Sequence, residues 1–66
     1  MTYAVKKRLA KEYAELRGKK IPFVHKGLKY TLKDLIAMLG RTQHSMIKIN
    51  GKYELNRSRF PELKNL

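Results

Sequence analysis

The first regular pattern along the chain is an apolar stripe at helical spacing near the N-terminus, made of Val5, Leu9, Tyr13 and Leu16. Residues at this spacing share one face of a helix, and that face can pack on a core. Thr2 is a suitable N-cap and Gly18 a suitable helix end. The pattern therefore predicts a helix from about Tyr3 to Arg17.

A short extended region follows the first helix. The run from Ile21 to Val24 is apolar, and Pro22 within it is typical of an edge strand or of the start of a strand. His25 to Gly27 then turns the chain, and Leu28 to Tyr30 returns as a second strand. The sequence thus predicts a small β-hairpin between Ile21 and Tyr30.

A second helical stripe comprises Leu32, Leu35, Ile36 and Leu39. Thr31 and Asp34 approximate a capping box at its start, which fixes the helix boundary. Gly40 offers the left-handed conformation of a helix exit, and Thr42 can cap a further helix that carries Met46 and Ile49. We therefore expect two helices joined by a sharp turn, the second running from about Gln43 to Ile49.

The Asn50-Gly51 pair allows a competing interpretation, because this dipeptide is also a strong signal for a tight hairpin. In such a hairpin Ile47 and Ile49 lie opposite Glu54 and Lys52, so the apolar faces of the two strands do not match. This mismatch favours the helix, with Gly51 at its C-terminal cap and Lys52–Leu55 as a strand beside the first hairpin. In the alternative, Met46–Leu55 is a β-ribbon that can itself carry a contact surface.

The C-terminal segment begins polar and basic and then becomes apolar. Arg57 and Arg59 alternate along its extended part, and Pro61 with Glu62 favours the start of a short helix. Phe60 and Leu63 are expected to dock on the core. The whole chain, residues 1–66, is thus predicted to be one small α+β domain with an N-terminal helix, a short β-hairpin, a helix-turn-helix and a terminal strand or wing.

Charge adds a strong constraint on the partner. The chain carries 16 Lys and Arg against 5 Asp and Glu, which gives a formal net charge of +11. Such an excess destabilises a small fold by self-repulsion and is typical of proteins that bind polyanions such as nucleic acid. The apolar runs are too short to span a membrane, and a secretory signal pattern is missing, so we expect the cytoplasm, either at a bacterial nucleoid or in a host cell.

Catalysis is not expected. The five acids show no paired-carboxylate pattern, and the sequence has neither a phosphate-binding glycine loop nor a metal-ligand cluster. The absence of cysteine excludes a thiolate zinc site and a disulfide framework. His25 and His44 lie too far apart in sequence to indicate a metal pair. We therefore predict no enzyme activity, no cofactor and no metal.

The exposed side of the expected second helix supplies the candidate contacts with nucleic acid. Gln43 is the best candidate base reader, because an amide can bind adenine through two hydrogen bonds, and Arg41 can read guanine or hold phosphate. The full set of predicted base-reading residues is Arg41, Thr42, Gln43, His44, Ser45 and Lys48. The predicted phosphate-binding residues are Lys6, Lys7, Lys33, Lys52, Arg57 and Arg59.

The segment from Thr31 to Asn50 resembles the helix-turn-helix of small bacterial and phage transcription regulators and excisionases. The positions that match its buried and turn residues are Leu35, Leu39, Gly40, Met46 and Ile49. Ile36 and Arg41 depart from the family pattern, which usually has a small and an aliphatic residue there. The order of elements is also similar to a reduced winged helix, with Lys52–Arg59 as the wing. The resemblance implies that Thr42–Lys48 enters the major groove of DNA.

Three functions follow as hypotheses. The first is a sequence-specific duplex-DNA binder that acts as a transcriptional regulator or recombination accessory factor. This hypothesis is compatible with a homodimer or a cooperative array on DNA. The second is an RNA-binding or ribosome-associated protein, because Ile47–Lys52 is similar to a strand-turn segment of RNA-binding modules such as the S4 type. The third is a phage-type inhibitor of a host enzyme that applies its basic face to an acidic surface of that enzyme. Binding to duplex DNA, to structured RNA or to neither separates them.

Overall fold

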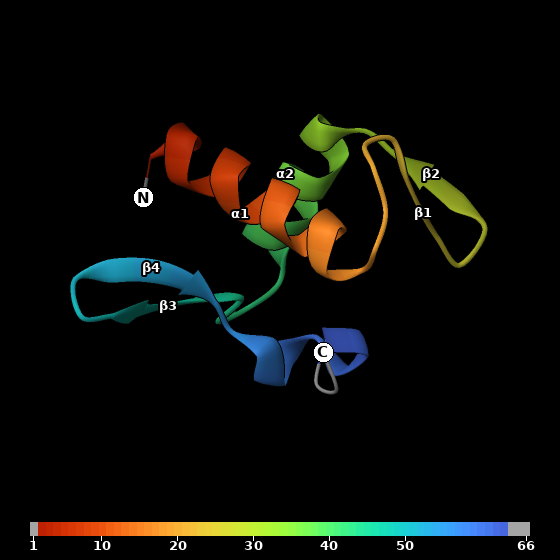
Figure 1. The fold of residues 1–66 in the computed structure, drawn as a ribbon. Helices are drawn as coiled ribbons and strands as arrows, with labels where there is room; N and C mark the ends of the chain where they lie inside the picture. The colour runs from red at the N-terminus through yellow and green to blue at the C-terminus, as the bar shows by residue number, and fades with distance from the viewer. Residues whose placement is uncertain (1, 64–66) are drawn as a thin grey trace.

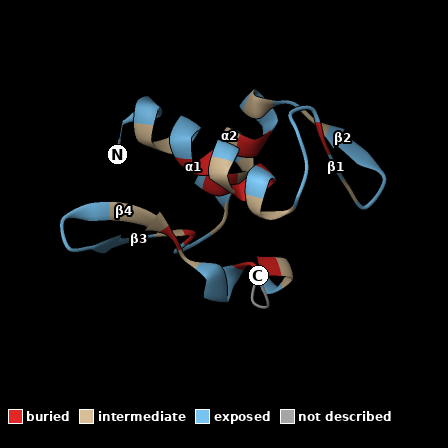
Figure 2. Cartoon of the chain, in the orientation of Figure 1, coloured by how far each residue is buried: buried red, intermediate tan, exposed pale blue. Residues whose placement is uncertain are grey.

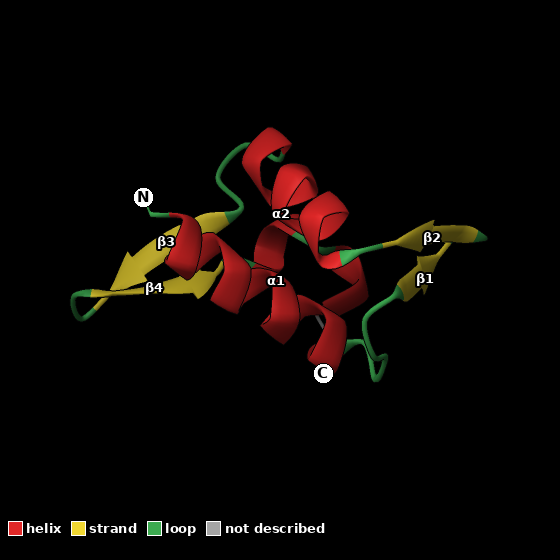
Figure 3. Ribbon diagram, turned by 90° about the horizontal axis from the view of Figure 1, so that it is seen from above, coloured by secondary structure: helices red, strands yellow, loops and turns green. Residues whose placement is uncertain are grey.

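The computed structural model describes residues 2–63, which form a small α+β domain, as the sequence predicts. Two helices pack together at the centre, and one β-hairpin projects from each end of the pair (Figure 1). Seen from above, the hairpins again lie at opposite ends of the helices (Figure 3). The elements in order are α1 (Tyr3–Leu16), β1 (Phe23–His25), β2 (Leu28–Tyr30), α2 (Leu32–Arg41), β3 (Met46–Ile49), β4 (Lys52–Leu55) and two 3₁₀ turns, η1 (Arg57–Arg59) and η2 (Pro61–Leu63).

The helix starts are those expected from the sequence. The Thr2 side chain accepts a hydrogen bond from the Val5 amide and caps α1. Thr31 and Asp34 form a reciprocal capping box at the start of α2, in which the Thr31 amide donates to the Asp34 carboxylate at 2.9 Å. Both caps satisfy backbone donors that the first turn of a helix leaves unpaired.

The core lies between α1 and α2 and includes buried residues of the C-terminal turns (Figure 2). Helix α1 contributes Leu9 and Tyr13, and α2 contributes Leu35 and Leu39, all fully buried. As predicted, Phe60 and Leu63 dock on this core, and Pro61 opens a short 3₁₀ turn. The Tyr13 ring contacts Phe60 and Phe23 at centroid distances of 5.3 and 5.5 Å, so it joins the C-terminal turns to β1.

The predicted second helix, Gln43–Ile49, is wrong, and the competing hairpin is what the chain forms. Strand β3 pairs with β4 in the register that places Ile47 opposite Glu54 and Ile49 opposite Lys52. Asn50 and Gly51 both have positive φ, of 51° and 80°, as the tight turn of a two-residue hairpin requires.

The sequence argument against this hairpin assumed that the two isoleucines must enter the core. Instead, the inner face of the hairpin carries Met46 and Leu55, and these meet the core, while Ile47 and Ile49 remain exposed on the outer face. The predicted position of the strand Lys52–Leu55 beside the first hairpin is also wrong, because within residues 2–63 this strand pairs with β3 alone. The hairpins β1–β2 and β3–β4 form separate two-stranded sheets.

Helix α2 also ends differently from the expectation. Gly40 does not adopt a left-handed conformation, and the helix continues through it to Arg41. Thr42 is therefore the C-cap of α2 rather than the N-cap of another helix. Its backbone amide and its hydroxyl both donate to the Met38 carbonyl at 3.0 Å, which satisfies an acceptor at the helix end.

A pair of glycine substitutions tests this assignment. Gly40→Ala is expected to stabilise the protein by up to about 1 kcal/mol, because alanine favours a helix interior and nothing lies within 4 Å of the added Cβ. Gly51→Ala is expected to destabilise it by roughly 1–2 kcal/mol, because φ at Gly51 is +80°. Chemical denaturation measures both changes. Destabilisation by Gly40→Ala would instead indicate the left-handed helix exit that the sequence pattern favoured.

Candidate nucleic-acid interface

The loop between α2 and β3 turns the chain tightly at the end of the helix. The Ser45 amide donates to the Thr42 carbonyl at 3.2 Å, and the Ser45 hydroxyl donates to the Leu39 carbonyl at 2.8 Å. Ser45 is only 2% exposed, so its side chain belongs to the interior. The loop is thereby tied to the last turn of α2, and the intervening Gln43 and His44 are exposed.

Asn56, just after β4, holds the same loop from the other side. Its side-chain amide donates to the His44 carbonyl at 2.9 Å, and its backbone amide donates to the Ser45 carbonyl at 2.8 Å. These bonds stabilise His44 at a φ of 56°, which is uncommon for a residue other than glycine. The Gln43 and His44 side chains therefore extend from a backbone that is fixed by hydrogen bonds at both ends.

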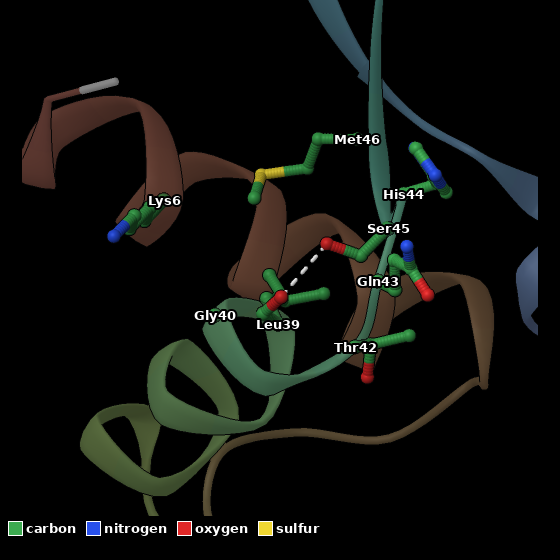
Figure 4. Close-up of a pocket in the computed structure, with 8 residues that line it drawn as sticks. All are labelled: Lys6, Leu39, Gly40, Thr42, Gln43, His44, Ser45 and Met46. Atoms are coloured by element: carbon green, nitrogen blue, oxygen red, sulfur yellow. Dashed lines mark hydrogen bonds between the residues drawn. The ribbon is translucent and has the colours of Figure 1, made fainter.

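Beside this loop lies an open hollow of about 330 Å³, which we call the loop hollow. Lys6 of α1 lies on one side and Thr42, Gln43 and His44 on the other (Figure 4). The complete lining is Lys6, Leu39, Gly40, Thr42, Gln43, His44, Ser45 and Met46. No carboxylate is present in this lining, so the hollow combines a cation, an amide and an imidazole without an anion.

The predicted base-reading residues do not share a helix face, but most of them remain together. Arg41 is exposed at the end of α2, next to the loop hollow. Thr42 is partly buried and uses its hydroxyl proton within the protein, and Ser45 is buried, so its expected exposure is wrong. Lys48 lies on β3, on the same strand face as Met46, with its ammonium 5.6 Å from the centre of the Tyr53 ring.

The predicted phosphate-binding residues are dispersed over the molecule. Lys6 lines the loop hollow. Lys7 is exposed but is not part of this lining, because adjacent residues of a helix point in different directions. Lys33 lies at the start of α2, and Lys52 is 4.0 Å from Glu54 on the outer face of β4. Arg57 and Arg59 lie in a 3₁₀ turn rather than in the extended segment expected from their alternation.

Three of the five acids have hydrogen-bond or ion-pair partners within the protein. Asp34 accepts hydrogen bonds from Thr31, and these lower the pKa of its carboxyl group. Glu62 accepts a hydrogen bond from the Tyr13 hydroxyl, and Glu54 lies beside Lys52. The exposed cations thus outnumber the acids that could offset them, and the surface potential is positive.

No family model, curated protein or solved structure matches this chain. Within residues 2–63, no helix has the length and apolar character needed to cross a membrane, and no three His, Cys, Asp or Glu side chains come together as a metal site.

Sequence reasoning missed two features of this region. The role of Asn56 could not be predicted from the sequence, because it depends on β4 returning the chain to the α2–β3 loop. A second hollow, of about 320 Å³, lies at the other end of α1 and includes Lys11, Lys19 and Lys20. Its lining also contains Glu15. The loop hollow differs from it in having no carboxylate and in carrying exposed amide and imidazole side chains that can reach bases.

A polar cluster joins α1 to the C-terminal turns away from the loop hollow. Burial and the hydrogen bond to Glu62 raise the pKa of Tyr13 well above its ordinary value. Partial burial raises the pKa of Glu62. The Tyr13 hydrogen bond, a backbone hydrogen bond and the charges of Arg17 and His25 together lower this pKa by more than burial raises it, so the net shift is downward. Glu62 is therefore ionised in the folded protein at neutral pH.

This cluster predicts an acid-dependent loss of stability. Because the folded-state pKa of Glu62 lies below the ordinary value of 4.5, the stabilisation is complete above that pH and is lost as the pH falls through the folded-state pKa. Tyr13→Phe is expected to cost about 1.5–3 kcal/mol at pH 7 and to reduce the acid-dependent loss. Thermal unfolding from pH 7 to pH 2 measures both, with exposed Tyr3→Phe as control. Unchanged acid sensitivity in Tyr13→Phe would contradict the coupling.

Proposed function

We propose that the protein binds duplex DNA through the loop hollow together with Arg41, between the lining residues Gly40 and Thr42, and Lys48, two residues beyond Met46 on β3. The observation that carries the proposal is the lining of the hollow, where Lys6 lies across from Gln43 and His44 and no carboxylate is present. A polyanion gains free energy there by releasing counterions from its phosphates. Exposed amide and imidazole groups, held on a fixed loop, add hydrogen bonds that can reach base edges.

Each side chain has a distinct part in this proposal. Lys6 and Lys48 hold phosphate oxygens and contribute affinity without sequence preference. Gln43 reads adenine in the major groove, and Arg41 binds either guanine or phosphate. The major groove admits a two-stranded β-ribbon as well as a helix, so the absence of a recognition helix does not prevent this contact.

The biological role that fits such binding is transcriptional regulation or recombination accessory function. This role is what the resemblance of the Thr31–Asn50 segment to small phage and bacterial regulators and excisionases implies. Such a protein works on DNA in the bacterial nucleoid or host cytoplasm. The proposal involves no catalysis and no cofactor.

Gln43→Ala tests the reading role. The preferred duplex is first selected from a random DNA pool, with structured RNA as competitor. The substitution is then expected to weaken binding to that duplex by about 1–3 kcal/mol and to leave binding to a shuffled duplex nearly unchanged. Lys20→Ala, in the second hollow, serves as the control. An equal loss on both duplexes would show that Gln43 does not read sequence.

Structured RNA is the second candidate, and one observation favours it. The Ile47–Lys52 segment forms a strand and turn, which is the feature that the sequence shares with S4-type RNA-binding modules. The same selection decides between the two candidates. Preference for the RNA competitor over every duplex would replace the DNA proposal with this one.

A further inference from the structure

The outer face of the β3–β4 hairpin differs from the rest of this basic molecule. It carries Ile47, Ile49, Lys52 and Glu54, whose side chains point away from the core because the alternate positions face inward. Ile47 and Ile49 are 38% and 47% exposed. The two charges of this face cancel, which leaves a small apolar surface without net charge on a chain of formal charge +11.

The other hairpin offers no equivalent surface. Its exposed Val24 is paired with Lys29 across the strands, and the turn adds Lys26. That face carries cations without a carboxylate, so two copies would repel one another there. The outer β3–β4 face is the one of the two hairpin surfaces where a second highly basic molecule can approach at low electrostatic cost.

We propose that this face binds the same face of a second copy of the chain. The strand register makes the face complementary to itself. A two-fold axis that lies between the two sheets, perpendicular to the strands, places Ile47 of each copy over Ile49 of the other. The same axis places Lys52 of each copy over Glu54 of the other, which gives two ion pairs along β4 beside an apolar contact along β3.

The electrostatics of the whole chain set the conditions for this association. The long-range repulsion between two molecules of charge +11 opposes the contact and is screened by salt. The apolar contact between isoleucines is not weakened by salt. Dimerisation is therefore expected to strengthen as salt increases, whereas phosphate binding weakens. The inference goes beyond the proposed function and does not depend on DNA.

Charge reversal at Lys52 and Glu54 tests the proposed pairing without DNA. Sedimentation equilibrium is measured over a protein-concentration series in about 0.5 M salt, where the Debye length is only a few ångströms. Glu54→Lys and Lys52→Glu are each expected to weaken dimerisation about tenfold or more, because each replaces two attractions by repulsions. The double reversal, Lys52→Glu with Glu54→Lys, is expected to restore it.

The single Lys52→Glu variant separates the proposed contact from a general charge effect. It lowers the net charge by two, so repulsion between whole molecules decreases, yet the proposal predicts weaker association. Circular dichroism confirms that each variant is folded. A wild-type chain that stays monomeric throughout the series, single reversals without effect, or a double reversal that fails to restore the dimer would overturn the proposal.

Discussion

Leu35→Ala is expected to lower the free energy of unfolding by about 2–5 kcal/mol, the usual cost of emptying a fully buried leucine site. Leu35 is 0% exposed and lies on the face of α2 that packs in the core. A 66-residue chain buries a small core and has little stability in reserve. A large fraction of this variant is therefore expected to be unfolded at room temperature.

Leu28→Ala is the matched control for that substitution. It removes the same atoms from a side chain that is 60% exposed on β2, so the expected change is within about 0.5 kcal/mol. Urea denaturation monitored by circular dichroism compares the two variants with the wild type. Equal losses in both variants would show that the core does not lie between the helices.

The second large effect concerns DNA binding. A triple variant, Lys6→Gln with Arg41→Gln and Lys48→Gln, removes the lysine that lines the loop hollow and the other two cations of the proposed contact. If each holds a phosphate, the slope of the logarithm of the binding constant against the logarithm of salt concentration decreases by about 3. Affinity for every duplex decreases with it, because these contacts carry no sequence information.

A second triple variant provides the matched control for charge. Lys11→Gln with Lys19→Gln and Lys20→Gln removes the same three charges from the second hollow, at the other end of α1. Its salt slope is expected to stay close to that of the wild type. If the two triple variants lose affinity equally, binding depends on net charge alone and the loop hollow is not the site.

The parts of the fold that the sequence predicts are those with local causes. Thr2 and Thr31 cap their helices through hydrogen bonds that span three residues. Lys26 and Gly27 have positive φ at the turn of the first hairpin, where a turn was expected. Each of these features depends on neighbouring residues, so a short stretch of sequence contains the information that determines it.

The prediction of a second helix required both isoleucines to enter the core and set aside the tight turn that Asn50-Gly51 indicates. Met46 and Ile49 were both placed in the core at helical spacing, but only Met46 packs there, opposite Leu55. Which residues of this segment are buried depends on its contacts with α1. One such contact is the 2.6 Å hydrogen bond that Arg8 donates to the Tyr53 carbonyl. Spacing alone does not contain this information.

In the candidate site, too, some features could be predicted from the local sequence and others depend on tertiary contacts. Gln43 and His44 were expected to be exposed on polarity alone, and they are. Ser45 was expected to join them, but the backbone turns at His44, and this directs the serine inward to the Leu39 carbonyl. The approach of Lys6 to this loop arises from helix packing, which a pattern of charges along the chain does not describe.

The most direct test of the central claim is to map the DNA contact on the wild-type protein by NMR. A ¹⁵N-labelled sample is titrated with the duplex selected for binding, and the amide shift of each residue is followed. The account predicts the largest changes at Lys6, at Arg41–His44 and at Lys48, with little change at Lys11, Lys19 and Lys20. Changes that centre on the second hollow, or an absence of binding at low salt, would contradict it.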